Sequence, residues 1–123
     1  MFINSEIIQK VNFFQFADPS FILIISKYLQ PELCLQDDYV IYKGAVATKM
    51  YFVKNGIVQV LSTDNKTVIA YMSEGTYFGE IGVLLTQKRT CFVKARTLCV
   101  FFTINKEDLI NAIETNSIVM KFL

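Results

Sequence analysis

The residues best suited to chemistry in this 123-residue sequence lie in one segment, residues 78–91. Gly79 permits a sharp turn after a strand, and a short helix over residues 80–86 would direct its unpaired backbone N–H groups back toward that turn. Helix N-termini of this kind bind anions. Arg89 can add a planar guanidinium and Thr90 a hydroxyl. The segment therefore predicts a site for a single phosphate group.

Glu80 is the unusual member of this segment, because a carboxylate beside a phosphate is repulsive. It fits the site if it accepts a hydrogen bond from another part of the ligand, such as a sugar hydroxyl. Only Arg89 and Arg96 among the 12 cationic residues are arginines, so few side chains can form a bidentate fork on an anion. An anion clamp with a hydroxyl acceptor predicts a phosphorylated sugar as ligand.

Glycines are concentrated in the same region. Gly75, Gly79 and Gly82 fall within eight residues, which is more glycine than a single turn requires. We therefore expect another group to approach this backbone closely.

The sequence Phe-Gly-Glu-Ile-Gly at residues 78–82, with Lys-Arg-Thr at 88–90, resembles the phosphate-binding cassette of cyclic nucleotide-binding domains. The resemblance extends along nearly the whole chain. Four stretches most resemble the cytoplasmic domain of hyperpolarisation-activated and cyclic nucleotide-gated cation channels: residues 16–21, 49–53, 55–60 and 88–95.

The resemblance implies a role for each matching residue of the cassette. The backbone of Gly79, Ile81 and Gly82 would hold the cyclic phosphate of the ligand. Glu80 would accept a hydrogen bond from the ribose 2′-hydroxyl. The expected ligand is cAMP or cGMP, with no cofactor, no metal and no catalytic residue.

The resemblance also assigns residues outside the first part of the cassette. Arg89 would pair with the phosphate, and Thr90 would bond the phosphate or the purine. Cys91 would contribute its backbone N–H. Inward side chains of the roll would line the purine, and by position Val60 and Met72 are the candidates.

Two departures from the family pattern bear on the ligand. Cys91 and Phe92 stand where the family usually has alanine and a small polar residue, and a thiol directed at the phosphate would crowd the pocket. The family also has a long C-terminal helix that closes over the base. In this chain only residues 117–123 could belong to that helix, as its truncated start. The preference between cAMP and cGMP stays open, because Thr90 is compatible with both.

These residues need a scaffold, and the hydrophobic pattern predicts a mainly β chain with flanking helices, built as an antiparallel barrel or sandwich. The resemblance implies the more specific α+β fold: an antiparallel β-roll or jelly-roll barrel with N-terminal helices, a short cassette helix and a C-terminal helix. Short runs rich in Val, Ile, Phe and Tyr recur at intervals of about 8–12 residues. These runs are Tyr39–Lys43, Met50–Lys54, Ile57–Leu61, Thr67–Met72, Cys91–Ala95 and Leu98–Thr103. The dipeptide at residues 55–56 (Asn-Gly) predicts a type I′ hairpin, and residues 63–66 predict another turn.

Helices are expected at both ends. Residues 5–16 have a helical pattern, and Pro19–Leu29 begins with proline at the first helical position. Asn105 can cap a third helix, with Asp108 placed as in a capping box. Ser117 offers a further cap near the end of the chain.

The length fits a single cyclic nucleotide-binding domain over residues 1–123 with one core. Its expected divisions are N-terminal helices at 1–30, the β-roll at 31–104 with its cassette at 78–91, and a B-helix with the truncated start of a C-helix at 105–123.

Composition excludes several other classes. The sequence has no histidine, which excludes Ser-His and Cys-His nucleophile pairs and the His-rich metal site of a cupin-like enzyme. A net charge of +1 is too balanced to favour nucleic acid as a partner. Cys34, Cys91 and Cys99 follow no metal or disulfide spacing and are expected to be reduced thiols. We therefore expect a binding protein that is not an enzyme.

Hydropathy bears on location. The mean hydropathy of +0.39 is high, yet no unbroken apolar run exceeds five residues, as in Phe21–Ile25, whereas a membrane span needs about 20. No signal peptide is evident. The resemblance to the channel domain implies a position on the cytoplasmic side of a membrane, and the high hydropathy fits a piece cut from a larger membrane protein. The resemblance also implies a tetramer for the full-length channel, whereas we expect the fragment to be monomeric.

The expected function is to sense a cyclic nucleotide and gate a cation channel. One alternative is a degenerate gating module that binds no nucleotide, although retained Glu80 and Arg89 argue against it. Another is the regulatory domain of a kinase or a transcription activator, which uses the same cassette.

Overall fold

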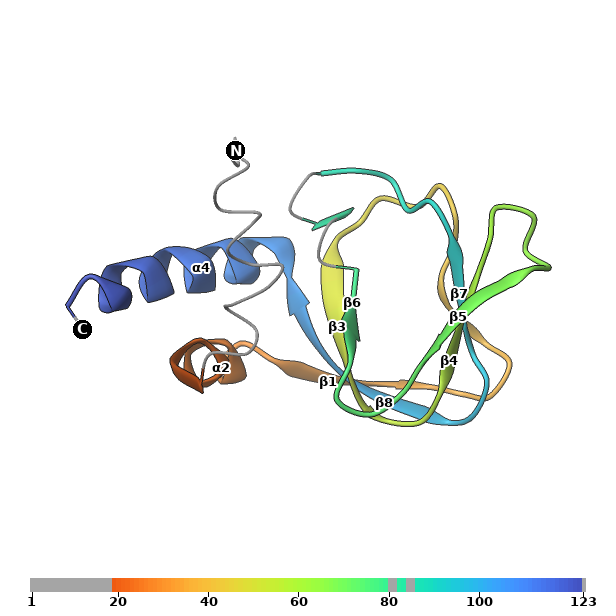
Figure 1. Cartoon of the computed structure of the whole chain (residues 1–123), viewed down its shortest axis with the longest axis horizontal. Helices are drawn as coiled ribbons and strands as arrows, with labels where there is room; N and C mark the ends of the chain where they lie inside the picture. Colours follow the sequence, from red (N-terminus) through yellow and green to blue (C-terminus); the bar gives the residue numbers. More distant parts are fainter. Residues whose placement is uncertain (1–18, 80–81, 84–85, 123) are drawn as a thin grey trace.

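A computed structural model of the chain describes residues 19–79, 82–83 and 86–122 (Figure 1). The helix expected over residues 5–16 lies outside the described residues, as do Glu80 and Ile81. The elements are α2 (Pro19–Ser26), β1 (Gln30–Cys34), β2 (Tyr39–Ile41), β3 (Lys49–Asn55), β4 (Val58–Leu61), β5 (Val68–Met72), β6 (Tyr77–Phe78), β7 (Phe92–Ala95), β8 (Cys99–Asn105) and α4 (Lys106–Met120).

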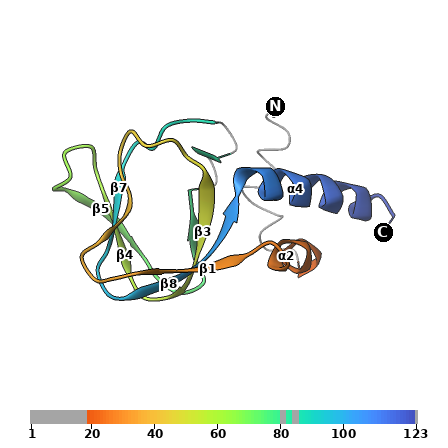
Figure 2. The ribbon, with the colours of Figure 1, turned by 180° about the vertical axis from the view of Figure 1, so that it is seen from behind.

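The strands form two four-stranded antiparallel sheets, which confirms the predicted β-roll. One sheet has the order β1-β8-β3-β6 and the other β2-β7-β4-β5. Both helices lie beside the first sheet and away from the second, as Figures 1 and 2 show from opposite sides. The fold is therefore an α+β arrangement in which the helices cover one wall of the roll.

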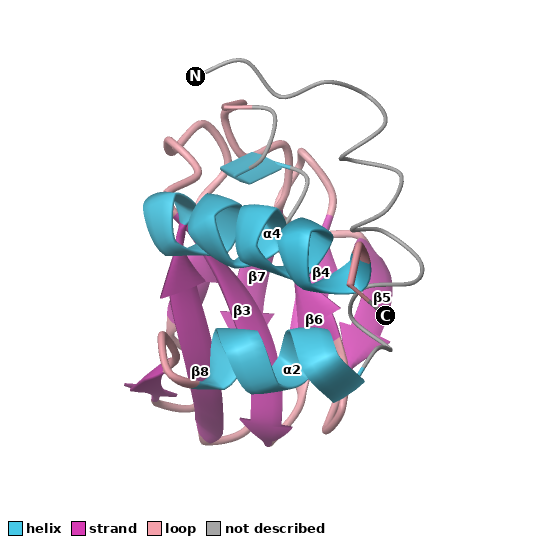
Figure 3. Ribbon diagram, turned by 90° about the vertical axis from the view of Figure 1, so that its left-hand side faces the viewer, coloured by secondary structure: helices cyan, strands magenta, loops and turns pink. Residues whose placement is uncertain are grey.

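The structure has two cores where the sequence predicted one. Strand β3 separates them because its side chains alternate between the faces of the sheet. Met50 is fully buried in the helix-side core together with Phe21 of α2 and Leu109 of α4. Tyr51 and Val53 belong instead to the core inside the roll. Figure 3 shows both helices crossing the outer side of the first sheet, so one sheet connects the helices to the roll interior.

The sequence pattern does not predict strand β1, because Pro31 lies inside it and proline is unfavourable within a strand. The strand forms at the sheet edge, where it pairs only with β8 among the described residues. The preceding helix also ends earlier than expected, at Ser26 in place of Leu29. The N–H of Tyr28 closes a turn on the carbonyl of Ile25 at 2.8 Å.

The predicted type I′ hairpin at residues 55–56 is wrong. β3 and β4 belong to different sheets, and Gly56 has a positive φ of 101° whereas Asn55 does not. A Cβ on Gly56 would lie 2.5 Å from the carbonyl oxygen of Leu98. The glycine therefore allows the chain to cross between sheets at close range. The turn predicted at residues 63–66 is confirmed, since it joins β4 to β5.

The cap at the start of α4 is confirmed, because the Asn105 side chain accepts a hydrogen bond from the Asp108 N–H at 2.8 Å. Ser117 does not begin a new helix. It lies inside α4, which runs uninterrupted to Met120, so the second helix start suggested by the sequence is wrong. No helix among the described residues is both long enough and apolar enough to span a bilayer.

Tyr51 should give the chain a specific sensitivity to alkaline pH. Its ring stacks on Phe78 at 5.0 Å and meets Phe101 edge-on at 5.5 Å, and burial raises its pKa to about 12. An unfolded tyrosine ionises near pH 10, so the stabilising effect of the neutral phenol is present below pH 10 and lost between about pH 10 and 12. We expect the free energy of unfolding to fall by about 2–3 kcal/mol more in wild type than in Tyr51→Phe across that window. Chemical denaturation at a series of pH values checks this, and equal declines would contradict it.

Candidate functional site

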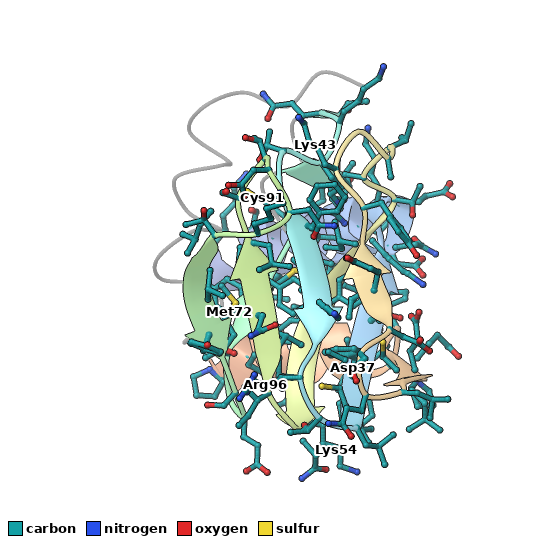
Figure 4. All side chains as sticks on the ribbon, turned by 90° about the vertical axis from the view of Figure 1, so that its right-hand side faces the viewer. Asp37, Lys43, Lys54, Met72, Cys91 and Arg96 are labelled. Atoms are coloured by element: carbon teal, nitrogen blue, oxygen red, sulfur yellow. The ribbon has the colours of Figure 1, made fainter. Side chains whose placement is uncertain are left out.

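A cavity of about 370 Å³ lies between the cassette and the second sheet. It brings together seven of the nine residues predicted for the site: Val60, Met72, Gly79, Gly82, Arg89, Thr90 and Cys91. The other two, Glu80 and Ile81, lie outside the described residues. Figure 4 views the molecule from the side of the second sheet and labels Met72 and Cys91.

The sheet side of the cavity is apolar. Ile41, Val93 and Val60 are successive cross-strand partners on β2, β7 and β4, and all three line the cavity with Met72 of β5. Because residues directly opposite on neighbouring strands point to the same face, they form one continuous wall. The sequence prediction did not include Ile41 and Val93. Their side chains point into the roll as that of Val60 does, so the alternation of side chains along each strand, which identified Val60, could also have identified them.

The cassette side is positioned by backbone pairing with residues 44–47. The N–H of Gly44 donates to the Arg89 carbonyl at 2.8 Å, and the N–H of Arg89 donates to the Ala45 carbonyl at 2.8 Å. Val46 and Lys88 form an isolated antiparallel bridge between the same segments. This pairing fixes the backbone of Arg89, so its side chain reaches the cassette glycines from a defined direction.

The Arg89 side chain contacts two backbone carbonyls. Its Nη1 donates to the carbonyl oxygen of Gly79 at 2.9 Å and its Nη2 to that of Lys49 at 2.5 Å. The Gly79 oxygen also accepts from the N–H of Val83 at 3.3 Å. The guanidinium therefore joins the cassette to β3 at the edge of the cavity, an arrangement that the sequence did not predict.

The two cassette glycines make room for this guanidinium. A Cβ on Gly79 would lie 2.9 Å from Nη1 of Arg89, and one on Gly82 would lie 3.2 Å from the same atom. Gly79 also has a φ of +88°, which side chains disfavour. Arg89 is therefore one group that closely approaches the cassette backbone, as the glycine-rich sequence predicts.

The charge of the cavity favours an anion. Among the described residues that line it, the charged side chains are Arg89, which is half-buried, and Lys88, which is exposed, and no carboxylate is present. The Thr90 hydroxyl lies 3.8 Å from the Cys91 sulfur, and both residues also face the cavity. An anionic group beside Arg89 would be attracted by a cation whose screening by water is reduced.

The site offers a polar end for an anion and an apolar wall for a flat ring system, which is the usual composition of a small-molecule pocket. Across the described part of the chain, no group of three His, Cys, Asp or Glu residues is arranged to hold a metal ion.

Comparison with known proteins gives the family. Residues 33–116 match the model of the cyclic nucleotide-binding domain, and the chain belongs to this family. It is 33% identical over 109 residues to the human potassium/sodium hyperpolarization-activated cyclic nucleotide-gated channel 2, a match that covers 89% of this chain and 12% of the channel. The corresponding channel 4 from rabbit is 32% identical over 109 residues, with 89% and 9% covered. The chain thus spans only a small part of these relatives.

A solved structure supports the fold. The catabolite activator protein of Thermus thermophilus superposes with a TM-score of 0.74 at 22% sequence identity, over 85% of this chain and 50% of that protein. At this identity the likeness concerns the fold alone. The resemblance predicted from the cassette and the flanking stretches is confirmed at the level of the family and of its similarity to the channel domain.

Proposed function

We propose that this domain binds a cyclic nucleotide, cAMP or cGMP, without catalysing a reaction. The observation that supports the proposal most directly is the cavity itself, which is lined both by Arg89 with the cassette glycines and by the apolar side chains of Val60 and Met72. The cyclic phosphate would lie beside Arg89 and Thr90, and the purine would lie against the wall. Membership of the cyclic nucleotide-binding family supports this orientation.

Phosphate binding would use the guanidinium of Arg89, which lines the cavity. Its present bonds to the carbonyls of Gly79 and Lys49 hold the guanidinium in place before the ligand arrives, so less side-chain entropy is lost on binding. A charge-assisted bond to phosphate is stronger than a bond to a neutral carbonyl. The phosphate would therefore bind the guanidinium in addition to these two carbonyls, or in place of one of them.

Binding at the cassette would be transmitted to the helices through two contacts. Val83, one residue after Gly82, is fully buried in the core that contains Leu109 of α4. Lys106, the first residue of α4, donates a hydrogen bond to the Thr86 hydroxyl within the cassette. A ligand that favours one position of the cassette would thereby favour one position of α4.

In this proposal the output is the gating of a cation channel on the cytoplasmic side of a membrane. The similarity to hyperpolarization-activated channels supports that context. The complete channel would contain four such domains, and this chain alone would be a monomer. The ligand would shift the gating equilibrium by the ratio of its affinities for the two states.

Ligand-dependent thermal stability tests the binding proposal. A ligand that binds only the folded chain raises its free energy of unfolding by RT ln(1 + [L]/Kd), so Tm rises with ligand concentration. We expect cAMP or cGMP to raise Tm progressively, and the non-cyclic 5′-AMP to have a much smaller effect at the same concentration. The absence of any shift with either cyclic nucleotide would contradict the proposal.

Glu80→Gln tests the assigned contact with the sugar. If the carboxylate accepts a hydrogen bond from the ribose 2′-hydroxyl, its replacement should weaken the binding of the ribonucleotide far more than that of its 2′-deoxy analogue. A charge-assisted hydrogen bond contributes about 1.5–3 kcal/mol, so we expect roughly a tenfold or greater loss for the ribonucleotide. Titration of both ligands into wild type and variant measures it, and equal losses would remove Glu80 from that role.

A further inference from the structure

Two cysteines that the proposed binding function does not use lie directly opposite each other on the two strands at the edge of the first sheet. Cys34, the last residue of β1, is the direct cross-strand partner of Cys99, the first residue of β8. Cys99 is fully buried in the core of the roll, and Cys34 is partly exposed and packs against that core. The two thiols therefore share one face of the ladder, and only Cys34 is open to solvent.

Their spacing is compatible with a covalent bond. Directly opposed residues of an antiparallel pair have Cα atoms about 4.5 or 5.5 Å apart, and both values fall inside the range of about 4.4–6.8 Å found in disulfides. At present the Cys34 sulfur lies 3.6 Å from the Asp38 carbonyl oxygen, and the Cys99 sulfur lies 3.3 Å from that of Ile57. Rotation of the two side chains away from these carbonyls would direct the sulfurs toward each other.

We propose that Cys34 and Cys99 form a reversible cross-strand disulfide when a low-molecular-weight disulfide such as oxidised glutathione is the oxidant. The Cys34 thiolate attacks one glutathione sulfur, so that a mixed disulfide forms and one glutathione thiolate leaves. The Cys99 sulfur then attacks the Cys34 sulfur and releases the second glutathione. Both cysteine protons end on the two glutathione molecules, which gain the two electrons that the protein thiols lose.

The order of these steps follows from exposure. Cys34 can reach a glutathione molecule from solvent, whereas Cys99 can react only with a neighbour inside the roll. Burial raises the pKa of the Cys34 thiol, and the nearby carboxylate of Asp38 raises it further. The first attack is therefore slow at neutral pH, which suits a link that forms only under sustained oxidation.

The disulfide would fix the position of β1. This strand lies at the edge of its sheet and pairs only with β8 among the described residues, and local opening is easiest where few hydrogen bonds and contacts hold a segment. A bond between residues 34 and 99 would hold the end of the ladder that lies farther from the helices. We expect the backbone amides of β1 to exchange with solvent at least about tenfold more slowly in the oxidised chain.

The test is to incubate the folded chain with excess oxidised glutathione at about pH 8.5, quench it in acid and map the peptides without reduction. The expected product is a cross-linked pair of peptides containing Cys34 and Cys99, with the loss of two hydrogen atoms. The Cys91→Ala chain, which keeps only this pair of thiols, should give the same product, and dithiothreitol should reverse it. Cys99→Ala should stop at a stable glutathione adduct on Cys34.

Three outcomes would overturn the proposal. One is a wild-type chain in which Cys34 remains a stable glutathione adduct, and another is a Cys34–Cys91 cross-link. The third is a chain whose Cys34 and Cys99 are both still free after prolonged incubation. The wild-type peptide map decides among them even if the Cys99→Ala chain does not fold. Cyclic nucleotide titration is a separate readout, so failure here would leave the proposed ligand function unaffected.

Discussion

Replacing Arg89 by alanine should weaken cyclic nucleotide binding by about 2–5 kcal/mol, which is roughly a thirtyfold to several-thousandfold loss of affinity. The loss has two causes. The phosphate would lose its charged partner in a partly desolvated cavity, and the carbonyls of Gly79 and Lys49 would lose the guanidinium that joins them. Calorimetric titration of wild type and variant measures the difference.

The second cause can be separated from the first. Arg89→Lys keeps the positive charge but cannot reproduce the planar fork that reaches two carbonyls, so its affinity should lie between those of wild type and Arg89→Ala. Arg96→Ala is the matched control, because Arg96 is exposed and does not line the cavity. Its affinity should equal that of wild type. An Arg89→Ala affinity within threefold of wild type would refute the assignment of Arg89 as the phosphate partner.

Replacing Gly79 by alanine should also reduce affinity, by tenfold or more, and should destabilise the chain by about 1–3 kcal/mol. The new Cβ would lie 2.9 Å from Nη1 of Arg89, so the guanidinium would have to move from its present position. The φ of +88° adds backbone strain for alanine. Affinity and free energy of unfolding should both be measured, because the clash acts on both.

Gly75→Ala provides the matched control for Gly79→Ala. Gly75 has nearly the same φ, +85°, but no atom lies within 4 Å of its added Cβ. The control should therefore show the backbone strain without the displacement of Arg89, and its ligand affinity should stay near that of wild type. Equal losses of affinity in the two variants would show that contact with Arg89 does not explain the need for glycine at position 79.

The sequence predicted much of this fold because its signals were local. The runs that became β2 to β5, β7 and β8 alternate or carry β-branched and aromatic residues, and Asn105 is a strong cap followed by helix formers. The cassette glycines and Arg89 were recognisable because phosphate binding needs those residue types at close spacing.

The errors arose where contacts distant in sequence determine the local structure. β1 contains Pro31 and forms because β8 offers a partner at the sheet edge. The turn at Gly56 joins two sheets and needs glycine, because the Leu98 carbonyl oxygen lies too close for any side chain at this position. Similarly, nothing in the local sequence shows that Arg89 donates to the carbonyl of Lys49, forty residues earlier.

Isothermal titration calorimetry of this chain with cAMP and with cGMP, each raised to about 1 mM, measures directly whether the cavity beside Arg89 binds a cyclic nucleotide. We expect saturable heat with one ligand molecule per chain for at least one of the two nucleotides, and a clearly weaker response from Arg89→Ala. If neither nucleotide produces binding heat with the folded wild-type chain and neither shifts its Tm, the cavity beside Arg89 is not a cyclic nucleotide site.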